Sequence, residues 1–339
     1  MRAFLLAAVT ALMPAGPATA FEIEAEAAFG TGPRQITVLS TTDIAALDEV
    51  LSDFAAAHPG HRLRYLQAAS SEIAAAVQSG AAQADLVISS AVGLQVKLVN
   101  DGFAQSLTID APGLPEWARW RDQLFGMGLE PVVTLISREA LGGLPPPATR
   151  RDLTAFLREH PARFEGRIGT YDPAISGVGY FLLAQDARKS EGFWRLAEVM
   201  GRLNTRLYCC SGEMIEDLGA GRLALAYNIV ASYTARTVPD NPDVLRLDFA
   251  DYTLAILRTG FVPRDAPDPE GGALLLGWLL SPAAQAQIAD LSGVALLDAP
   301  GGTPAHLHTI PLDVGLLVDE DRARRSNLLA EWVAAMTQP

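Results

Sequence analysis

Hydroxyl-bearing residues follow three predicted strands of the sequence, each at a point where a helix is expected to begin. The three clusters are Ser40-Thr41-Thr42 with Asp43, Ser70-Ser71, and Ser89-Ser90. Side-chain hydroxyls and the unpaired N–H groups of a helix N-terminus can donate hydrogen bonds to a ligand, above all to an anion. Each residue could instead cap its own helix. Because the carboxyl ends of parallel strands meet at one edge of a sheet, we expect the clusters to converge on one ligand site.

A fourth candidate is the loop Ser176-Gly177-Val178, which lies in the segment 167–180 with the sequence RIGTYDPAISGVGY. A short strand ends at Asp172-Pro173, and a helix begins behind Ser176. The missing side chain of Gly177 would let a ligand approach the backbone closely. The loop therefore predicts an anion site at a helix N-terminus, although such loops also simply connect strands to helices.

The elements that must position these residues alternate between strands and helices. Apolar runs at 35–40, 62–67 and 85–88 predict strands, and each is followed by a helical pattern. With 339 residues, the chain suits two lobes. We predict an α/β fold in which each lobe has a mostly parallel sheet flanked by helices. The first lobe would comprise 21–137 and 248–339 and the second 138–247, joined by two crossover strands.

The N-terminal residues 1–20 have the pattern of a secretory signal peptide. Arg2 precedes a run without charge from Ala3 to Met13, and Ala18-Thr19-Ala20 forms a small-x-small cleavage site. We therefore expect the mature protein to be soluble and periplasmic.

Composition and motifs exclude several other functions. The formal net charge of −13 argues against nucleic acid as a partner. Neither a G-x-S-x-G nucleophile elbow nor a phosphate-binding G-x-x-x-x-G-K-S/T loop occurs, so we predict no enzyme and no cofactor. His306 and His308 could ligate a metal, but no carboxylate or third histidine stands beside them in the sequence.

The two cysteines of the chain, Cys209 and Cys210, are adjacent in the sequence. A disulfide between neighbours closes a strained eight-membered ring, because consecutive Cα atoms lie closer together than in ordinary disulfides. A vicinal bridge and a pair of reduced cysteines both remain open. A bridge would form a stiff apolar plate beside the ligand.

Four segments together resemble the periplasmic solute-binding proteins of the ferric-ion-binding type. These are QITVLSTTD, DLVISS, DPAISGVGY and GEMIEDLGAGRLALAYN, and their order and spacing hold over nearly the whole mature chain. The resemblance implies a two-lobed type II binding fold that closes on its ligand by hinge motion. It also implies delivery of the ligand to the permease of an ABC transporter.

The iron site of that family is incomplete in this sequence. The positions that match the family's iron ligands are Asp43, Ser90, Tyr227 and Asn228, and only the tyrosine is retained. Ferric ion favours hard anionic oxygen donors, so we expect no tight iron loading and no metal site.

The loop at Ser176-Gly177-Val178 matches the place where family members hold a small anion. The sequence therefore resembles the receptors for sugar phosphates and other organophosphates more than the iron receptors. We predict a phosphate ester whose charged end contacts this loop and Ser40-Thr41-Thr42. Asp43, Ser90, Tyr208, Tyr227 and Asn228 would select the rest of the ligand.

Two alternatives stay open, an iron-binding receptor of the same fold and a sensor that reports the solute to a membrane histidine kinase. We expect the protein to be a monomer.

Overall fold

The computed structural model describes residues 21–234, 241–292 and 306–337. The predicted signal peptide at 1–20 lies outside the described residues. Within the described part of the chain, no helix combines the length and the apolar character needed to cross a membrane.

The N-terminal part of the chain forms a sheet whose central strands are parallel. Strands β3 (His61–Gln67), β2 (Arg34–Ser40) and β4 (Leu86–Ser89) lie side by side, and β1 (Ala25–Phe29) pairs antiparallel with β3 at the edge. All four residues of β4 are buried, as expected for a parallel strand that is covered on both faces. The three strands end at the predicted hydroxyl clusters, so the mixed α/β prediction is confirmed here.

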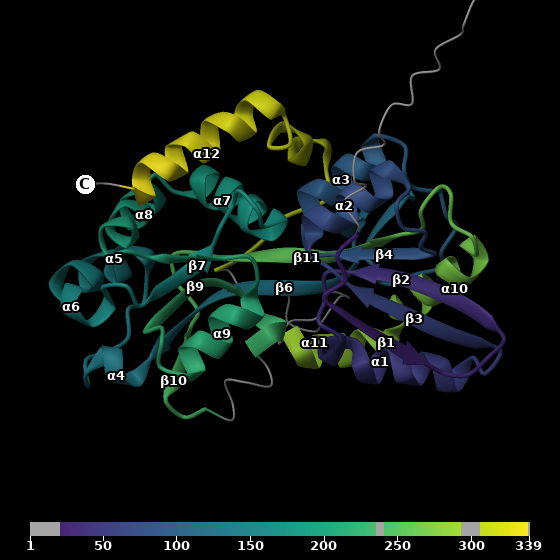
Figure 1. The fold of residues 1–339 in the computed structure, drawn as a ribbon, viewed down its shortest axis with the longest axis horizontal. Coiled ribbons are helices and arrows are strands. Elements are labelled where there is room, and N and C mark those ends of the chain that lie inside the picture. Colours follow the sequence, from purple (N-terminus) through teal and green to yellow (C-terminus); the bar gives the residue numbers. More distant parts are fainter. Residues whose placement is uncertain (1–20, 235–240, 293–305, 338–339) are drawn as a thin grey trace, which may run out of the picture.

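Helices cover both faces of this sheet (Figure 1). Helices α1 (Ile44–Ala57), α10 (Pro269–Leu279) and α11 (Pro282–Ser292) lie on one face, where Leu47, Phe54 and Leu276 join a buried apolar cluster. Helices α2 (Ser70–Ser79) and α3 (Val92–Asn100) lie on the other face. Because α1, α2 and α3 follow directly after β2, β3 and β4, their N-termini all point to the same edge of the sheet.

Strand β6 (Leu124–Ser137) connects the two parts of the molecule. It pairs antiparallel with β11 (Thr253–Phe261) up to Pro131 and with β9 (Leu225–Val230) from Val132 onward. Strand β10 (Val244–Leu247) pairs with the end of β6, and the chain then returns into β11 beside β4. The sheet is therefore continuous through β6 and β11, and the predicted lobe boundaries remain a prediction.

The second part of the sheet continues from β9 to β7 (Ile168–Tyr171) and β8 (Arg206–Tyr208), and these three strands are parallel. Its longer helices are α5 (Arg150–Glu159), α7 (Gly177–Lys189), α8 (Gly192–Arg202) and α9 (Ser211–Gly219), and the short ones are α4 (Arg138–Leu141) and α6 (Pro161–Phe164). A separate apolar cluster, which includes Leu157, Phe193 and Leu196, holds these helices to the sheet.

Four further elements are short: β5 (Arg119–Trp120), β12 (Leu307–Thr309) and the 3-10 turns η1 (Glu116–Ala118) and η2 (Ala231–Thr234).

The C-terminal segment 306–337 contacts both parts of the molecule, and we call it the strap. Turn η3 (Val314–Val318) packs on α3, whereas α12 (Arg322–Met336) crosses to α8, where Trp332 stacks on Phe193 (Figure 1). Asp319 between them accepts hydrogen bonds from Arg188 of α7 and from Arg324. The apolar face of α12 therefore joins the apolar cluster of the second part of the sheet, while the assignment of 248–339 to the first lobe remains a prediction.

Candidate functional site

A cavity of about 340 Å³ opens where the edges of the two sheet parts face each other. Its wall combines the ends of β2, β3, β4, β7, β8 and β9 with the N-termini of the helices that follow. The volume falls within the range of small-molecule sites in proteins. The lining residues are Glu24, Thr41, Asp43, Gln67, Ala68, Ala69, Ser70, Ser90, Tyr171, Ile175, Ser176, Val178, Cys209, Cys210, Ser211, Gly212, Glu213, Val230 and Tyr233.

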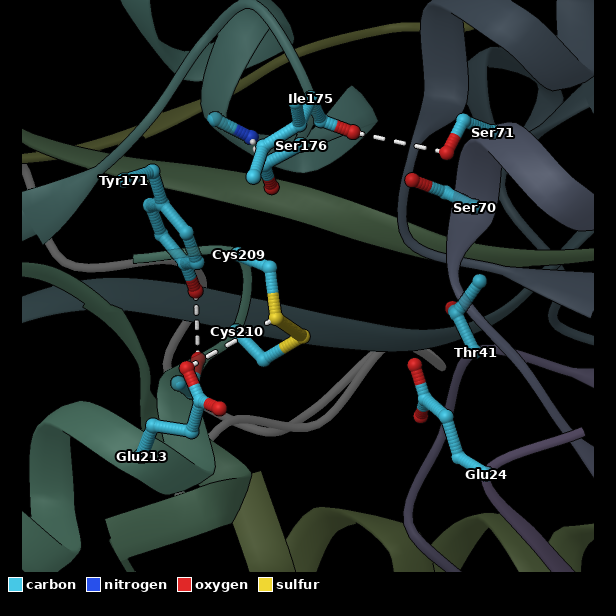
Figure 2. The surroundings of a disulfide bond; sticks show 12 residues. Glu24, Thr41, Ser70, Ser71, Tyr171, Ile175, Ser176, Cys209, Cys210 and Glu213 are labelled. Atoms are coloured by element: carbon cyan, nitrogen blue, oxygen red, sulfur yellow. Dashed lines mark hydrogen bonds between the residues drawn. A yellow bond between two sulfur atoms is a disulfide. The ribbon is translucent and has the colours of Figure 1, made fainter. Parts of the chain in front are cut away.

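Three hydrogen bonds join the two sides of this pocket. The Ser70 hydroxyl accepts from the amide of Gly177 at 3.1 Å, and the Ser71 hydroxyl donates to the carbonyl of Ile175 at 3.4 Å. The Tyr233 hydroxyl donates to the carbonyl of Thr41 at 3.0 Å. Figure 2 shows Ser70 and Ser71 facing Ile175 and Ser176 above the disulfide. The structure therefore has its two sides in contact around the pocket.

Five of the predicted ligand-binding residues line the pocket together, namely Thr41, Asp43, Ser90, Ser176 and Val178. The two hydroxyl clusters at the ends of β2 and β4 interlock, because the Thr41 hydroxyl accepts from the amide of Ser90 at 3.3 Å. The Ser90 hydroxyl itself is buried and has no hydrogen-bond partner among the described residues. It is therefore a free polar group at the pocket wall.

The neighbours Ser40, Thr42 and Ser89 do not line the pocket. The Ser40 hydroxyl accepts from the amide of Thr42 at 3.0 Å, and the Ser89 hydroxyl accepts from the amide of Ala91 at 3.0 Å. These side chains hold the turns after β2 and β4. The capping alternative is wrong for them, because the residues that precede α1 and α3 are Asp43 and Ala91 and neither helix has a side-chain cap.

Most backbone donors of the loop before α7 are already paired. The Ser176 hydroxyl accepts from the amide of Gly179 at 3.1 Å, and the Gly177 amide donates to Ser70 across the pocket. A Cβ at position 177 would lie 2.5 Å from the Ser70 hydroxyl, so the glycine allows this close approach. In this conformation the loop joins the two sides and has few donors left for an anion.

Tyr227 and Asn228 lie away from the pocket, in a buried cluster around Asp186 of α7. The Tyr227 hydroxyl and the Asn228 amide donate to Asp186 at 3.2 and 2.8 Å, and Tyr252 donates at 2.8 Å. Arg150 lies 3.8 Å from the same carboxylate. Burial raises the pKa of Tyr227, although the nearby Arg150 charge lowers it.

The pairing of β6 with β9 explains this placement. Its register shifts opposite Tyr227 and Asn228, and Asn228 has a positive φ of 65°. A β-bulge of this kind redirects side chains, and only Val230 at the end of β9 reaches the pocket. Tyr208 also lies outside the pocket, because its hydroxyl donates to Asp217 at 2.6 Å.

Three carboxylates line the pocket, from Glu24, Asp43 and Glu213. The Gln67 amide donates both to Asp43 at 2.9 Å and to Glu24 at 3.2 Å, which holds these two side chains on one side. Burial raises the pKa of Asp43, the charge of Glu24 raises it further, and the buried Arg258 lowers it. Arg258 itself lies 2.9 Å from Glu130, and both side chains are buried.

Cys209 and Cys210 are joined by a disulfide in the structure, and both line the pocket between β8 and α9. The Cys209 sulfur lies 3.8 Å from the Glu213 carboxylate. Figure 2 shows the bridge between Glu213 on one side and Thr41 and Glu24 on the other. Tyr171 beside it forms a hydrogen bond with Ser211, and burial raises the pKa of Tyr171 to about 12. The bridge is thus part of the pocket wall.

Sequence reasoning missed Glu24, Gln67, Tyr171, Glu213 and Tyr233. Tyr171 ends β7 and Glu213 lies in the first turn of α9, so the strand-end argument applied to the second lobe would have found both. Glu24 reaches the pocket because its backbone pairs with Gln67 at the end of β3, and no sequence pattern indicates that pairing.

Among the described residues, no three histidine, cysteine, aspartate or glutamate side chains are placed to hold a metal ion. His308 instead lies 2.8 Å from the Lys189 amine.

Comparisons with known proteins agree with the fold. Residues 36–290 match the family described as bacterial extracellular solute-binding protein. The structure is similar to the substrate-binding protein of an ABC transporter from Agrobacterium tumefaciens, with 31% identity, a TM-score of 0.86 and coverage of 92% of this chain and 98% of that one. A comparison with curated protein sequences found no significant match.

Two more distant structures share the two-lobed fold. The periplasmic binding protein AfuA from Actinobacillus pleuropneumoniae, with fructose-6-phosphate bound, has 13% identity, a TM-score of 0.71 and coverage of 91% and 100%. Iron-bound HitA from Pseudomonas aeruginosa has 16% identity, a TM-score of 0.67 and coverage of 89% and 99%. The fold is therefore the two-lobed type II binding fold that the sequence predicts. The proteins of this family bind transport substrates and are not enzymes.

Proposed function

The chain belongs to the bacterial extracellular solute-binding proteins, and we propose that it captures a small polar solute in the pocket between its lobes and delivers it to the permease of an ABC transporter. The protein acts in the periplasm, as a monomer. The observation that carries this proposal is the cavity of about 340 Å³ whose wall comes from both sides of the crossing strands.

The contacts across the pocket support a hinge mechanism. Ser70, Ser71 and Tyr233 form hydrogen bonds that exist only when the two sides approach. Rotation about the crossing segments near Pro131 and between β10 and β11 would separate these partners and open the pocket. The structure, in which these hydrogen bonds join the two sides, then corresponds to the closed state.

Thermal-shift screening combined with small-angle X-ray scattering tests this proposal. A solute present at 100 times its dissociation constant should stabilise the protein by about 2.7 kcal/mol and reduce its radius of gyration. A confirmed ligand that leaves the scattering profile unchanged would contradict closure. If no candidate solute raises the melting temperature, solute capture itself is wrong.

A phosphate ester, the ligand predicted from the sequence, is one candidate for this solute. Its support is that α2 and α9 begin at the pocket without a side-chain cap, so their first N–H groups can bond to anionic oxygens. The three carboxylates of the pocket oppose it, because a phosphate among them would be repelled. The structure with fructose-6-phosphate bound shares only the fold with this chain.

Ferric iron is less well supported. Tyr227 is 1% exposed and bonded within the Asp186 cluster, away from the pocket. A sensory role with a membrane histidine kinase would use the same closure, and pull-down of the permease or of a kinase from membranes would distinguish the two partners.

A further inference from the structure

The charged side chains that line the pocket are all negative. Glu24, Asp43 and Glu213 line it, and of the described residues that line it none is lysine, arginine or histidine. The charge of Arg258 lowers the pKa of Asp43, but Arg258 does not line the pocket and is already paired with Glu130. The pocket therefore holds negative charge for which its own wall has no counter-ion.

The three carboxylates also form no ion pair with the described residues outside the pocket. No ion pair joins Glu24, Asp43 or Glu213 to a described residue, whereas Glu216 in the next turn of α9 pairs with Arg222. Glu24 and Asp43 share only the Gln67 amide, and Glu213 contacts the disulfide sulfur. Uncompensated carboxylates in a half-enclosed site favour a ligand of opposite charge.

The arrangement suits an extended cation better than a metal ion. The carboxylates come from both sides of the pocket, with Glu24 and Asp43 joined through Gln67 on one side and Glu213 on the other. Figure 2 shows the disulfide between Glu24 and Glu213. The described residues contain no set of three such groups around a single point. A metal ion needs its oxygen ligands at about 2.0–2.6 Å, whereas an organic cation can meet them around its whole surface.

Two further features point to a bound organic molecule. Ser90 lines the pocket and is 3% exposed, and its buried hydroxyl has no partner among the described residues, so it is available to bond to a polar group of a ligand. Tyr171 and Tyr233 add aromatic rings to the wall, and aromatic rings attract cations.

On these grounds we infer that the solute carries a positively charged organic centre, such as an ammonium group, which binds among Glu24, Asp43 and Glu213 while Ser90 bonds to its polar remainder. This inference rests on the proposed function, since it names the substrate class of the same pocket. The ligand makes the closed state favourable because it neutralises carboxylates that closure brings together.

The test is a thermal-shift and calorimetry screen of the mature protein with small probes of opposite charge. The cationic set is choline, putrescine and arginine, and the anionic set is glycerol 3-phosphate, fructose 6-phosphate, phosphate and citrate. We expect at least one cationic probe to raise the melting temperature and the anionic probes to have no effect. Binding should weaken as salt is added, because the attraction is between charges.

Glu213→Gln and Glu216→Gln form a matched pair on α9. Both remove one carboxylate, but Glu213 lines the pocket and Glu216 does not. We expect Glu213→Gln to weaken binding of the cationic probe about tenfold and Glu216→Gln to leave it unchanged, since loss of one hydrogen bond to a charged group has an effect of that size.

Three outcomes would overturn the inference. If anionic probes bind and cationic ones do not, the substrate class is wrong while solute capture stands. If a cationic probe binds equally well to wild type and Glu213→Gln, the placement among the carboxylates is wrong. If no probe of either charge binds, the proposed function fails together with the inference.

Discussion

Replacing Asp186 with asparagine should strongly destabilise the protein without affecting solute binding. Asp186 has no exposed surface and accepts hydrogen bonds from Tyr227, Asn228 and Tyr252. The Arg150 guanidinium, with 5% of its side chain exposed, lies 3.8 Å away. Asparagine keeps the shape but removes the charge, and its NH₂ group faces groups that also donate. The buried Arg150 then loses its fully buried counter-ion and keeps only the partly exposed Asp251 at 3.4 Å.

The magnitude follows from the burial of this pair. Breaking a buried ion pair by removing one partner costs about 3–5 kcal/mol. At about 2–4 °C per kcal/mol, this lowers the melting temperature by roughly 6–20 °C. The carboxylate of Asp248, paired with Arg246 at 2.8 Å on the surface, offers a matched control, and Asp248→Asn should cost less than about 1 kcal/mol.

Urea unfolding at pH 7, followed by tryptophan fluorescence, measures both variants, and calorimetry with a confirmed solute measures their affinity. If Asp186→Asn is no less stable than Asp248→Asn, the cluster does not hold the second lobe as we argue. If the folded Asp186→Asn variant loses solute affinity tenfold or more while Asp248→Asn does not, Tyr227 and Asn228 belong to the binding site after all.

Three further predictions concern the pocket and its surroundings. Because burial raises the pKa of Asp43 in the folded state, its contribution to stability is present below about pH 4 and is lost as pH rises through the folded-state pKa. Asp43→Asn should therefore melt higher than wild type at pH 7 and the same at pH 3.5, and thermal melts that show no such difference would count against an unfavourable carboxylate. Ser70→Ala removes the acceptor for the Gly177 amide and should weaken closure on a solute by about 1 kcal/mol, or roughly fivefold in affinity, whereas Ser71→Ala, with a 3.4 Å exposed bond, should have little effect. Addition of ferric citrate should produce no visible tyrosinate-to-iron absorption band, and a band that disappears in Tyr227→Phe would show that the buried tyrosine binds iron.

The supporting elements of the site could be predicted well from the sequence, because they depend on local patterns. The apolar runs before Ser40, Ser70 and Ser89 and the helical patterns after them correspond to β2, β3 and β4 with α1, α2 and α3. The rule that parallel strands end at one edge then brings Thr41, Asp43 and Ser90 together without any further information.

The rest of the site depends on contacts that no local pattern contains. The bulge that directs Tyr227 and Asn228 toward Asp186 arises from the register between β6 and β9, which are about 90 residues apart in the sequence. Glu24 enters the pocket through its pairing with the end of β3, and Gly177 loses its free amide to Ser70 of the opposite lobe. The charge balance of the pocket changes with these placements, so the anionic ligand predicted from the loop at Ser176 has weaker support from the three-dimensional arrangement.

The strap at 306–337 has a consequence for the rate at which a solute leaves. Two crossing segments alone form a hinge that can swing widely, but η3 is packed on α3 while α12 is packed on α8, and Asp319 ties the junction to Arg188. A wide opening must therefore slide or detach one of these contacts, and Gly201, where a Cβ would lie 2.5 Å from the Ala335 carbonyl, shows how closely α12 is seated. If the molecule opens by the proposed hinge motion, we expect the strap to act as a tether that limits the opening angle and slows escape of a captured molecule. The residence time of the solute would then be set in part by a C-terminal segment whose described residues do not line the pocket.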